Sequence, residues 1–471
     1  MNVSSPLPAP AQTALYHAVW RWHFLARLFA LPFLLNLAVT GGLYLFTPEI
    51  DHLLYRSLKD VPVRAAAPLP ASVLVQKTAA ATQGEVLRLT LPAGPDKSVE
   101  MLFRSSAGES RTAYVDPYDG ALLGTIPVGG VMQIVRKIHS LQYFGFWASC
   151  LVEIAAGWAV VLALSGIFLW WPRGRSGGVV TIRATPKYRM FWRDLHAVTG
   201  LFTCAVIVFL AVTGMPWSKV WGGYVQEWTT AAGLGQPKPP AGVVPDWQLA
   251  SGKSESAGHD EHEGHRHGGA APAANLPWAL EKTVPPESGQ TTRAAILLDE
   301  ALASFTSLGL QKPFTIALPS GPKGAFTASF RPNRVEETRV VYLDQYSGKV
   351  LGDTGFAQYG PAAKAIEWGI HVHQGEEYGG INRYVMLAGC IAIVLLVISA
   401  PVMWWKRRPK GSFGMPPAAA SRGAALSVLA VMAIAGVIYP LTGLSMLAAL
   451  ILERLYDLGQ HAFARRGRVL Q

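Results

Sequence analysis

Four histidines of this chain lie in two matched sequence contexts. His23 and His196 are each followed, 18 residues later, by the glycine that ends a Val-Thr-Gly triplet. His139 and His373 are each followed, 31 residues later, by a Trp-Trp pair. Neutral imidazoles ligate iron, and a six-coordinate b-type haem takes one axial nitrogen on each of its faces. Because the four histidines repeat in register, they predict two b-type haem sites rather than isolated polar residues at a membrane interface.

The elements that position these histidines are expected to be membrane spans. Half of the 471 residues are hydrophobic and only 15% are charged, a composition typical of an integral membrane protein. Five apolar runs approach the roughly 20 residues that cross a bilayer core. The sequence therefore predicts about five transmembrane helices, at residues 24–46, 139–171, 196–217, 373–405 and 424–452.

Lysine and arginine are concentrated in two short segments between these spans, residues 172–195 and 406–423. Short loops of this kind stay on the cytoplasmic side of the membrane. Residues 1–23 are then also cytoplasmic, and the long segments 47–138 and 218–372 lie outside. The formal net charge of +11 is explained by this topology and not by nucleic-acid binding.

The basic tail, residues 453–471, conflicts with an odd number of spans, because five spans place it outside. Either the tail violates the charge rule, or the last apolar segment is a re-entrant hairpin interrupted at Pro440. We expect five spans and keep the hairpin as the alternative.

Each long outer segment has the pattern of a small α+β domain, with one helix followed by three strands. Both end in a similar turn, Tyr114–Gly120 and Tyr342–Gly348, whose glycines fit positions of positive φ. The expected fold is an α-helical membrane protein with two periplasmic α+β domains and an internal duplication. The expected helices are 71–83 and 293–307, and the expected strands are 86–91, 99–104, 112–116, 314–318, 326–330 and 339–344.

An insert rich in Pro, Gly and Ala, near residues 235–289, interrupts the second outer segment and is expected to be disordered. It is either a solvated linker or a loose metal-collecting loop, since neutral imidazoles bind transition ions. The histidines of this weak metal site are His259, His262, His265 and His267.

The topology places His23 and His196 at the cytoplasmic ends of their spans, and His139 and His373 at the periplasmic ends. His371 is the one plausible substitute ligand, for His373. Arg27 lies four residues from His23, on the same helix face, and either meets a haem propionate or pairs with lipid phosphate.

Glu153 is a carboxylate inside the second span and therefore a functional candidate, able to carry a proton or bind a quinol. Its counterpart in the repeat is Leu387, so it does not belong to the paired scheme.

Several motifs carry a resemblance to a known family, among them the two outer turns and residues 164–173. The others are His139 with Gly145, His373-Gln374-Gly375 with Gly379, residues 404–409 and residues 440–443. In these the chain resembles the PepSY-associated transmembrane helix family. That family includes the iron-regulated membrane proteins and the inner-membrane ferric-siderophore reductases of Gram-negative bacteria.

The resemblance implies PepSY-like outer domains and a di-haem oxidoreductase that passes electrons to chelated ferric iron in the periplasm, in iron uptake. Carried onto this chain, the axial ligands are His23, His196, His139 and His373. The short cytoplasmic segments contain no Gly-rich dinucleotide cradle, so the donor is expected to be a membrane quinol or a separate reductase. We expect electrons to enter at the pair His23/His196 and to leave at His139/His373, toward a ferric siderophore or another metal chelate.

Two other functions remain open. A siderophore or metal (copper or iron) transporter would use the histidines as translocation ligands, although transporters usually bind their cargo near the bilayer midplane. A regulator would bind a periplasmic peptidase through its PepSY-like domains, which leaves the paired histidines unexplained. The presence of bound haem would distinguish a reductase from both the transporter and the regulator.

Overall fold

The computed structural model describes residues 11–172, 177–235, 276–281, 283, 285–289, 294–409, 414–416 and 422–469. These residues divide into two compact units, a helical unit and a sheet unit. The helical unit comprises Met1–Leu45, Val135–Val225 and Arg383–Gln471, and the sheet unit comprises Phe46–Ile134 and Gln226–Asn382.

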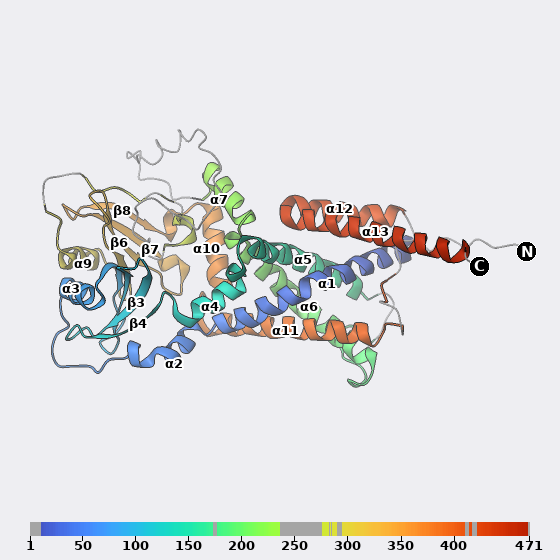
Figure 1. Cartoon of the computed structure of the whole chain (residues 1–471), viewed down its shortest axis with the longest axis horizontal. Helices are drawn as coiled ribbons and strands as arrows, with labels where there is room; N and C mark the ends of the chain where they lie inside the picture. Colours follow the sequence, from blue (N-terminus) through green and yellow to red (C-terminus); the bar gives the residue numbers. More distant parts are fainter. Residues whose placement is uncertain are drawn as a thin grey trace, which may run out of the picture. The chain divides into compact units, whose positions relative to one another are not determined.

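Four of the described helices are long and apolar enough to cross a membrane (Figure 1). They are α1 (Ala11–Tyr44), α5 (Phe146–Trp170), α6 (Arg189–Gly214), which continues into the 3-10 turn η2 (Met215–Trp217), and α11 (Gly379–Trp405). In each helix the backbone polar groups hydrogen-bond within the segment, and the side chains are apolar, as a lipid environment requires. The chain is therefore a membrane protein.

Two of the spans begin later than the sequence predicts, at Phe146 and Gly379 instead of residues 139 and 373. Gly145 has φ +89° and Gly379 has φ +58°, a conformation that interrupts a right-handed helix. His139 and His373 therefore end separate shorter helices, α4 (Gly130–His139) and α10 (Pro361–His373).

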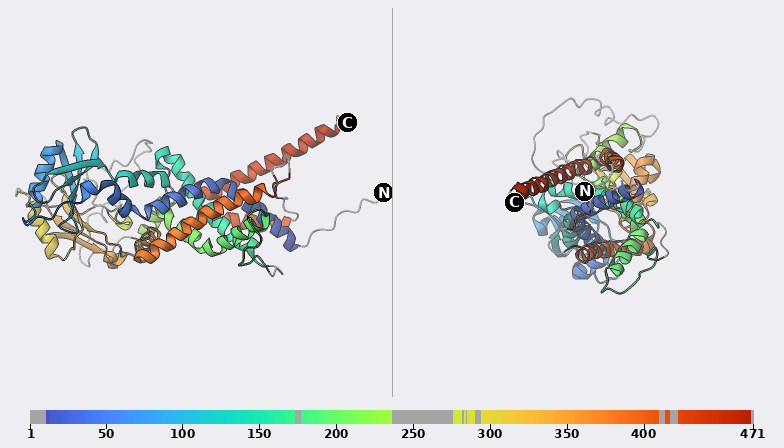
Figure 2. Two further views of the ribbon diagram at one scale, coloured as in Figure 1. Left: turned by 90° about the horizontal axis from the view of Figure 1, so that it is seen from below. Right: turned by 90° about the vertical axis from the view of Figure 1, so that its right-hand side faces the viewer.

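The expected single helix over residues 424–452 is wrong. The chain forms two helices instead, α12 (Arg422–Ile438) and α13 (Pro440–Val469), which pack on each other as a hairpin (Figures 1 and 2). Proline at the start of α13 supplies no backbone donor to continue α12. The break thus matches the interruption at Pro440 that the sequence offered as the alternative.

Two glycines allow this hairpin to close. A Cβ added at Gly443 would lie 2.6 Å from the Cα of Gly436, with no flexible side chain to move aside. We expect Gly443→Ala to destabilise the chain by about 1–3 kcal/mol through overpacking. The measurement is the thermal midpoint in detergent. Gly423→Ala is the control, because its Cβ would meet nothing within 4 Å and should leave the midpoint unchanged.

The sheet unit contains one antiparallel sheet of eight strands in the order β4-β3-β2-β1-β5-β6-β7-β8. Each copy of the repeat supplies four strands. They are β1 (Gly84–Thr90), β2 (Val99–Ser105), β3 (Ser110–Val115) and β4 (Leu122–Pro127), then β5 (Thr315–Ala317), β6 (Ala325–Phe330), β7 (Arg339–Asp344) and β8 (Val350–Gly355). The copies join where β1 pairs with β5, with Leu89 opposite Ile316. The expected pair of separate outer domains is thus corrected to a single fused unit.

Period-two alternation sends neighbouring side chains of a strand to opposite faces of this sheet. Val341 and Leu343 pack with α3 (Ala71–Thr82) and α9 (Leu298–Ser307), whereas Val340 and Tyr342 pack with α10 and the 3-10 turn η3 (Trp278–Leu280). Asp299 of α9 also accepts the backbone N–H groups of Ala71 and Ser72, at 2.7 and 3.3 Å, and so caps the start of α3.

The remaining described elements are shorter. They are α2 (Thr47–Lys59), η1 (Gln142–Phe144), α7 (Trp221–Ala231), η4 (Val335–Glu337) and η5 (Phe356–Gln358). The expected turn glycines are confirmed, since Gly120 and Gly348 have φ +71° and +67°.

Candidate cofactor site

The four long helices form a ring in which α1 and α6 each contact both α5 and α11. Ala38 of α1, Ile207 of α6 and Ile393 of α11 share one apolar cluster, and α5 packs along both α1 and α6. Figure 1 shows α1, α5, α6 and α11 alongside one another. Side chains from α1 and α6 can thus face each other between α5 and α11.

His23 of α1 is held by a hydroxyl of α5. Its Nδ1 lies 2.8 Å from Oγ of Ser165, and that hydroxyl donates to the carbonyl of Val161 at 2.6 Å. Because the serine proton is used on its own helix, the oxygen accepts and Nδ1 carries the imidazole proton. None of the described residues hydrogen-bonds Nε2, whose lone pair remains available to a ligand.

His196 of α6 repeats this arrangement with α11. Its Nδ1 lies 2.9 Å from Oγ of Ser399, which donates to the carbonyl of Leu396 at 3.2 Å. The two rings lie close enough for a charge on one to act on the other, so they belong to the same part of the ring of helices. Two half-buried imidazoles from opposite helices, each with Nδ1 engaged, are suited to hold one metal centre through Nε2.

His139 shows the same chemistry at the opposite end of α1. Its Nδ1 lies 2.9 Å from Oγ1 of Thr40, which donates to the carbonyl of Asn36. Asn36 in turn donates through Nδ2 to the carbonyl of Ile138 at 3.1 Å. Burial lowers the pKa of His139 to about 4, so the ring is neutral at pH 7.

His373 and His371 both lie in the sheet unit, on α10, but in different surroundings. His371 is 1% exposed, and its Nδ1 donates to the carbonyl of Asn333 at 3.0 Å. The carboxylates of Glu376 and Glu377 lie 3.8 and 3.9 Å from the same nitrogen. His373 is half-buried at the last residue of the helix. The enclosed ring of His371 thus holds segment 331–337 in place.

Arg27 lies one helical turn from His23 and interacts electrostatically with both His23 and His196. Its guanidinium stands 4.2 Å from the ring of Phe24 and donates to the carbonyl of Ala400 at 3.3 Å. No carboxylate of the described residues forms an ion pair with it. A half-buried cation without a carboxylate partner among the described residues favours an anionic group beside the two histidines.

Glu153 has a structural role that the sequence does not reveal. Its Oε2 accepts the backbone N–H groups of Val220 and Trp221, at 3.1 and 3.3 Å, where α7 begins. The side chain is 1% exposed, and Oε1 has no partner among the described residues.

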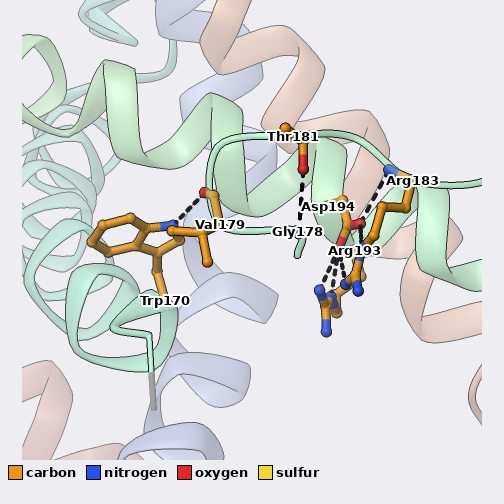
Figure 3. A network of polar contacts seen from close by, with 7 residues as sticks. All are labelled: Trp170, Gly178, Val179, Thr181, Arg183, Arg193 and Asp194. Atoms are coloured by element: carbon orange, nitrogen blue, oxygen red, sulfur yellow. Dashed lines mark hydrogen bonds and ion pairs between the residues drawn. The ribbon is translucent and has the colours of Figure 1, made fainter. Parts of the chain in front are cut away.

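The loop between α5 and α6 is tied down by one buried carboxylate, Asp194 (Figure 3). Arg183 donates to it through its backbone N at 3.2 Å and its Nε at 2.8 Å, and Arg193 donates through Nε at 2.8 Å. Trp170 Nε1 donates to the carbonyl of Val179 at 2.8 Å, which fixes the other end of the loop. Asp194 lies two residues before His196, so this network also fixes the start of α6.

Comparison with protein families gives a match to the PepSY-associated TM region over residues 20–407. The chain belongs to the PepSY-associated TM family. It is a membrane protein of the iron-regulated membrane protein type. The comparison with curated proteins finds no match.

The histidines that the sequence singles out in this PepSY-associated TM protein are thus placed as follows. His23 and His196 come together in the helical unit, His139 lies in the same unit at the other end of α1, and His373 lies in the sheet unit. The insert histidines His259, His262, His265 and His267 fall outside the described residues.

The hydroxyl partners Ser165, Ser399 and Thr40 were missed by the sequence reasoning, although a signal was present. Ser165 and Ser399 are separated by 234 residues, the same offset that relates His139 to His373. Thr40 belongs to the Val-Thr-Gly triplet that marked the repeat. Two hydroxyl residues that occupy equivalent positions of repeated apolar helices are therefore candidate hydrogen-bond partners of the repeated histidines.

Proposed function

We propose that this chain is a di-haem b-type reductase of the bacterial inner membrane, which moves electrons to chelated ferric iron in the periplasm. The observation that carries the proposal is the matched pair of contacts from Ser165 to His23 and from Ser399 to His196. Each contact places the proton on Nδ1 and leaves Nε2 for an axial bond.

The residues of the helical unit fit a b-type haem at His23 and His196. When bound, the haem supplies one-electron exchange between ferric and ferrous iron. Arg27 provides the positive charge that a propionate requires. Gly166 of α5 lies beside that ring, since an added Cβ there would be 3.6 Å from Cε1 of His23.

The second pair, His139 with His373, is assigned by the duplication. Thr40 orients His139 as Ser165 orients His23. We keep His373 rather than His371, because His373 matches His139 at the repeat offset, whereas His371 is 1% exposed and donates to the carbonyl of Asn333. The N-terminus is proposed to be cytoplasmic, and the donor a membrane quinol or a separate reductase.

One optical experiment tests this function. The purified full-length chain is expected to show a Soret band, α and β bands on dithionite reduction, and about two haems per chain. The reduced protein should then be reoxidised by a ferric hydroxamate siderophore with formation of ferrous iron, measured by a ferrous-specific chromogenic chelator.

The outcomes separate the candidate functions. A chain without any Soret band would rule out the reductase and favour the regulator. Uptake of labelled chelate into proteoliposomes without a reductant would favour the transporter. Haem that is reduced but not reoxidised by any ferric chelate would leave a haem protein with another acceptor.

A further inference from the structure

Basic side chains gather where the two loops that follow the Trp-Trp pairs meet in the helical unit. Lys187, Arg189 and Lys406 are exposed, and Arg183 and Arg193 are partly exposed. Lys406 Nζ donates to the carbonyl of Lys187 at 2.8 Å, so the loops of the two repeat copies are joined. We call these five residues the basic face.

Membrane topology alone does not explain the geometry of this face. The charge rule counts lysines and arginines and needs no fixed arrangement. Here Asp194, with 0% exposure, is placed between Arg183 and Arg193 and cancels one positive charge of the loop. An acid in this position works against topology, but it holds two guanidinium groups in one geometry.

The loop backbone is shaped around the same two guanidinium groups. Gly178 has φ +74°, and a Cβ there would come within 2.3 Å of Arg183 Nη2 and 2.6 Å of Arg193 Nη2. Figure 3 shows Gly178 and Thr181 beside this network. A fixed array of charges suits recognition of a structured surface, whereas mobile lysines suffice for lipid headgroups.

Exposed apolar side chains lie among these charges. Val180 is 59% exposed, Ile182 is 45% exposed and Tyr188 is 64% exposed. Apolar and aromatic anchors with arginine around them are the composition of a protein–protein interface. Between residues 171 and 193 and between residues 378 and 452 the sequence contains no acid, so the partner must supply the negative charge.

We propose that the basic face docks a soluble, acidic electron-transfer protein that carries a flavin or an iron–sulfur centre. This inference rests on the proposed function and names its donor. The short loops beside the face contain no nucleotide cradle of their own. One electron leaves the reduced partner and one ferric haem becomes ferrous, with no bond or proton transferred.

The test uses the full-length chain in nanodiscs of zwitterionic lipid and an acidic [2Fe–2S] ferredoxin as the probe. Lys187→Glu/Arg189→Glu reverses two charges on the face without touching Asp194 or its partners. Arg136→Glu/Lys219→Glu is the matched control, because it changes the net charge equally at residues outside the face. The Kd is measured by biolayer interferometry at low and at physiological salt, with empty nanodiscs as the blank.

We expect the face variant to weaken binding about tenfold or more at low salt, since electrostatic steering acts over a defined patch. The control should stay within about twofold, and the salt dependence should flatten only in the face variant. Equal loss in both variants, or no binding by the unmodified chain, overturns the proposal. So does a face variant that keeps the Kd of the unmodified chain.

The Soret band of each variant distinguishes failure of the docking proposal from failure of the proposed function. Absence of haem from the chain would contradict the proposed function. Full haem content together with a Kd that does not change in the face variant would contradict the docking proposal alone.

Discussion

We expect His23→Ala to lower the haem content of the purified chain from the proposed two to about one per chain. An alanine cannot supply the axial nitrogen, and none of the described residues beside Ser165 offers another imidazole except His196 itself. His196→Ala should give the same loss, and the double variant should lose no more than either single one. The measurement is a pyridine haemochrome assay against protein concentration.

His17→Ala is the matched control for this prediction. It removes an imidazole from the same helix, six residues away, where the ring contacts Tyr16 and Trp20. Its haem content should remain at the unmodified value. If the double variant lost both haems, the two histidines would belong to different sites and the pairing would be wrong.

The four histidines could be singled out from the sequence because a duplication leaves its offset in the chain. Apolar composition also identified the four long helices, because length and hydropathy decide whether a helix can cross a bilayer. Helix ends were less predictable. Gly145 and Gly379 adopt positive φ and so interrupt the helices. The sequence alone does not predict this conformation, because glycine also occurs with negative φ inside helices.

The pairing of β1 with β5 could not be predicted from the sequence for a different reason. β1 and β5 lie more than 220 residues apart, and each reads locally as an ordinary strand of its own domain. Nothing in the alternation of β1 says which strand lies beside it. The edge strands β4 and β8 were missed because Gly124 and Gly352 interrupt short, half-exposed segments.

The hydrogen bonds of the site depend on helix packing, which local periodicity does not supply. Ser165 could equally be a residue that only bonds its own helix, as Ser149 does through the carbonyl of Gly145. Packing of α5 against α1 makes the difference between these two serines. This difference permits a test within a single helix.

We expect Ser165→Ala to weaken haem binding by about 10–100-fold, the usual effect of removing the group that orients a ligating histidine. Without the hydroxyl, Nδ1–H of His23 loses its acceptor, and the ring no longer has one preferred tautomer. The midpoint potential of one haem should shift, since hydrogen bonding at Nδ1 tunes the basicity of the ligand. Haem titration of the apoprotein gives the affinity, and a potentiometric titration followed at the α band gives the potential.

Two further variants decide whether the effect belongs to the hydroxyl. Ser165→Thr keeps an oxygen at the same position and should restore both affinity and potential. Ser149→Ala removes a buried hydroxyl from the same helix, but one that bonds only the carbonyl of Gly145, and both readings should stay unchanged. A Ser165→Ala chain with unchanged potential would show that packing alone orients His23. Because Ser399 stands to His196 as Ser165 stands to His23, Ser399→Ala should alter the same haem, and the effects of the two variants should then fall on one redox transition.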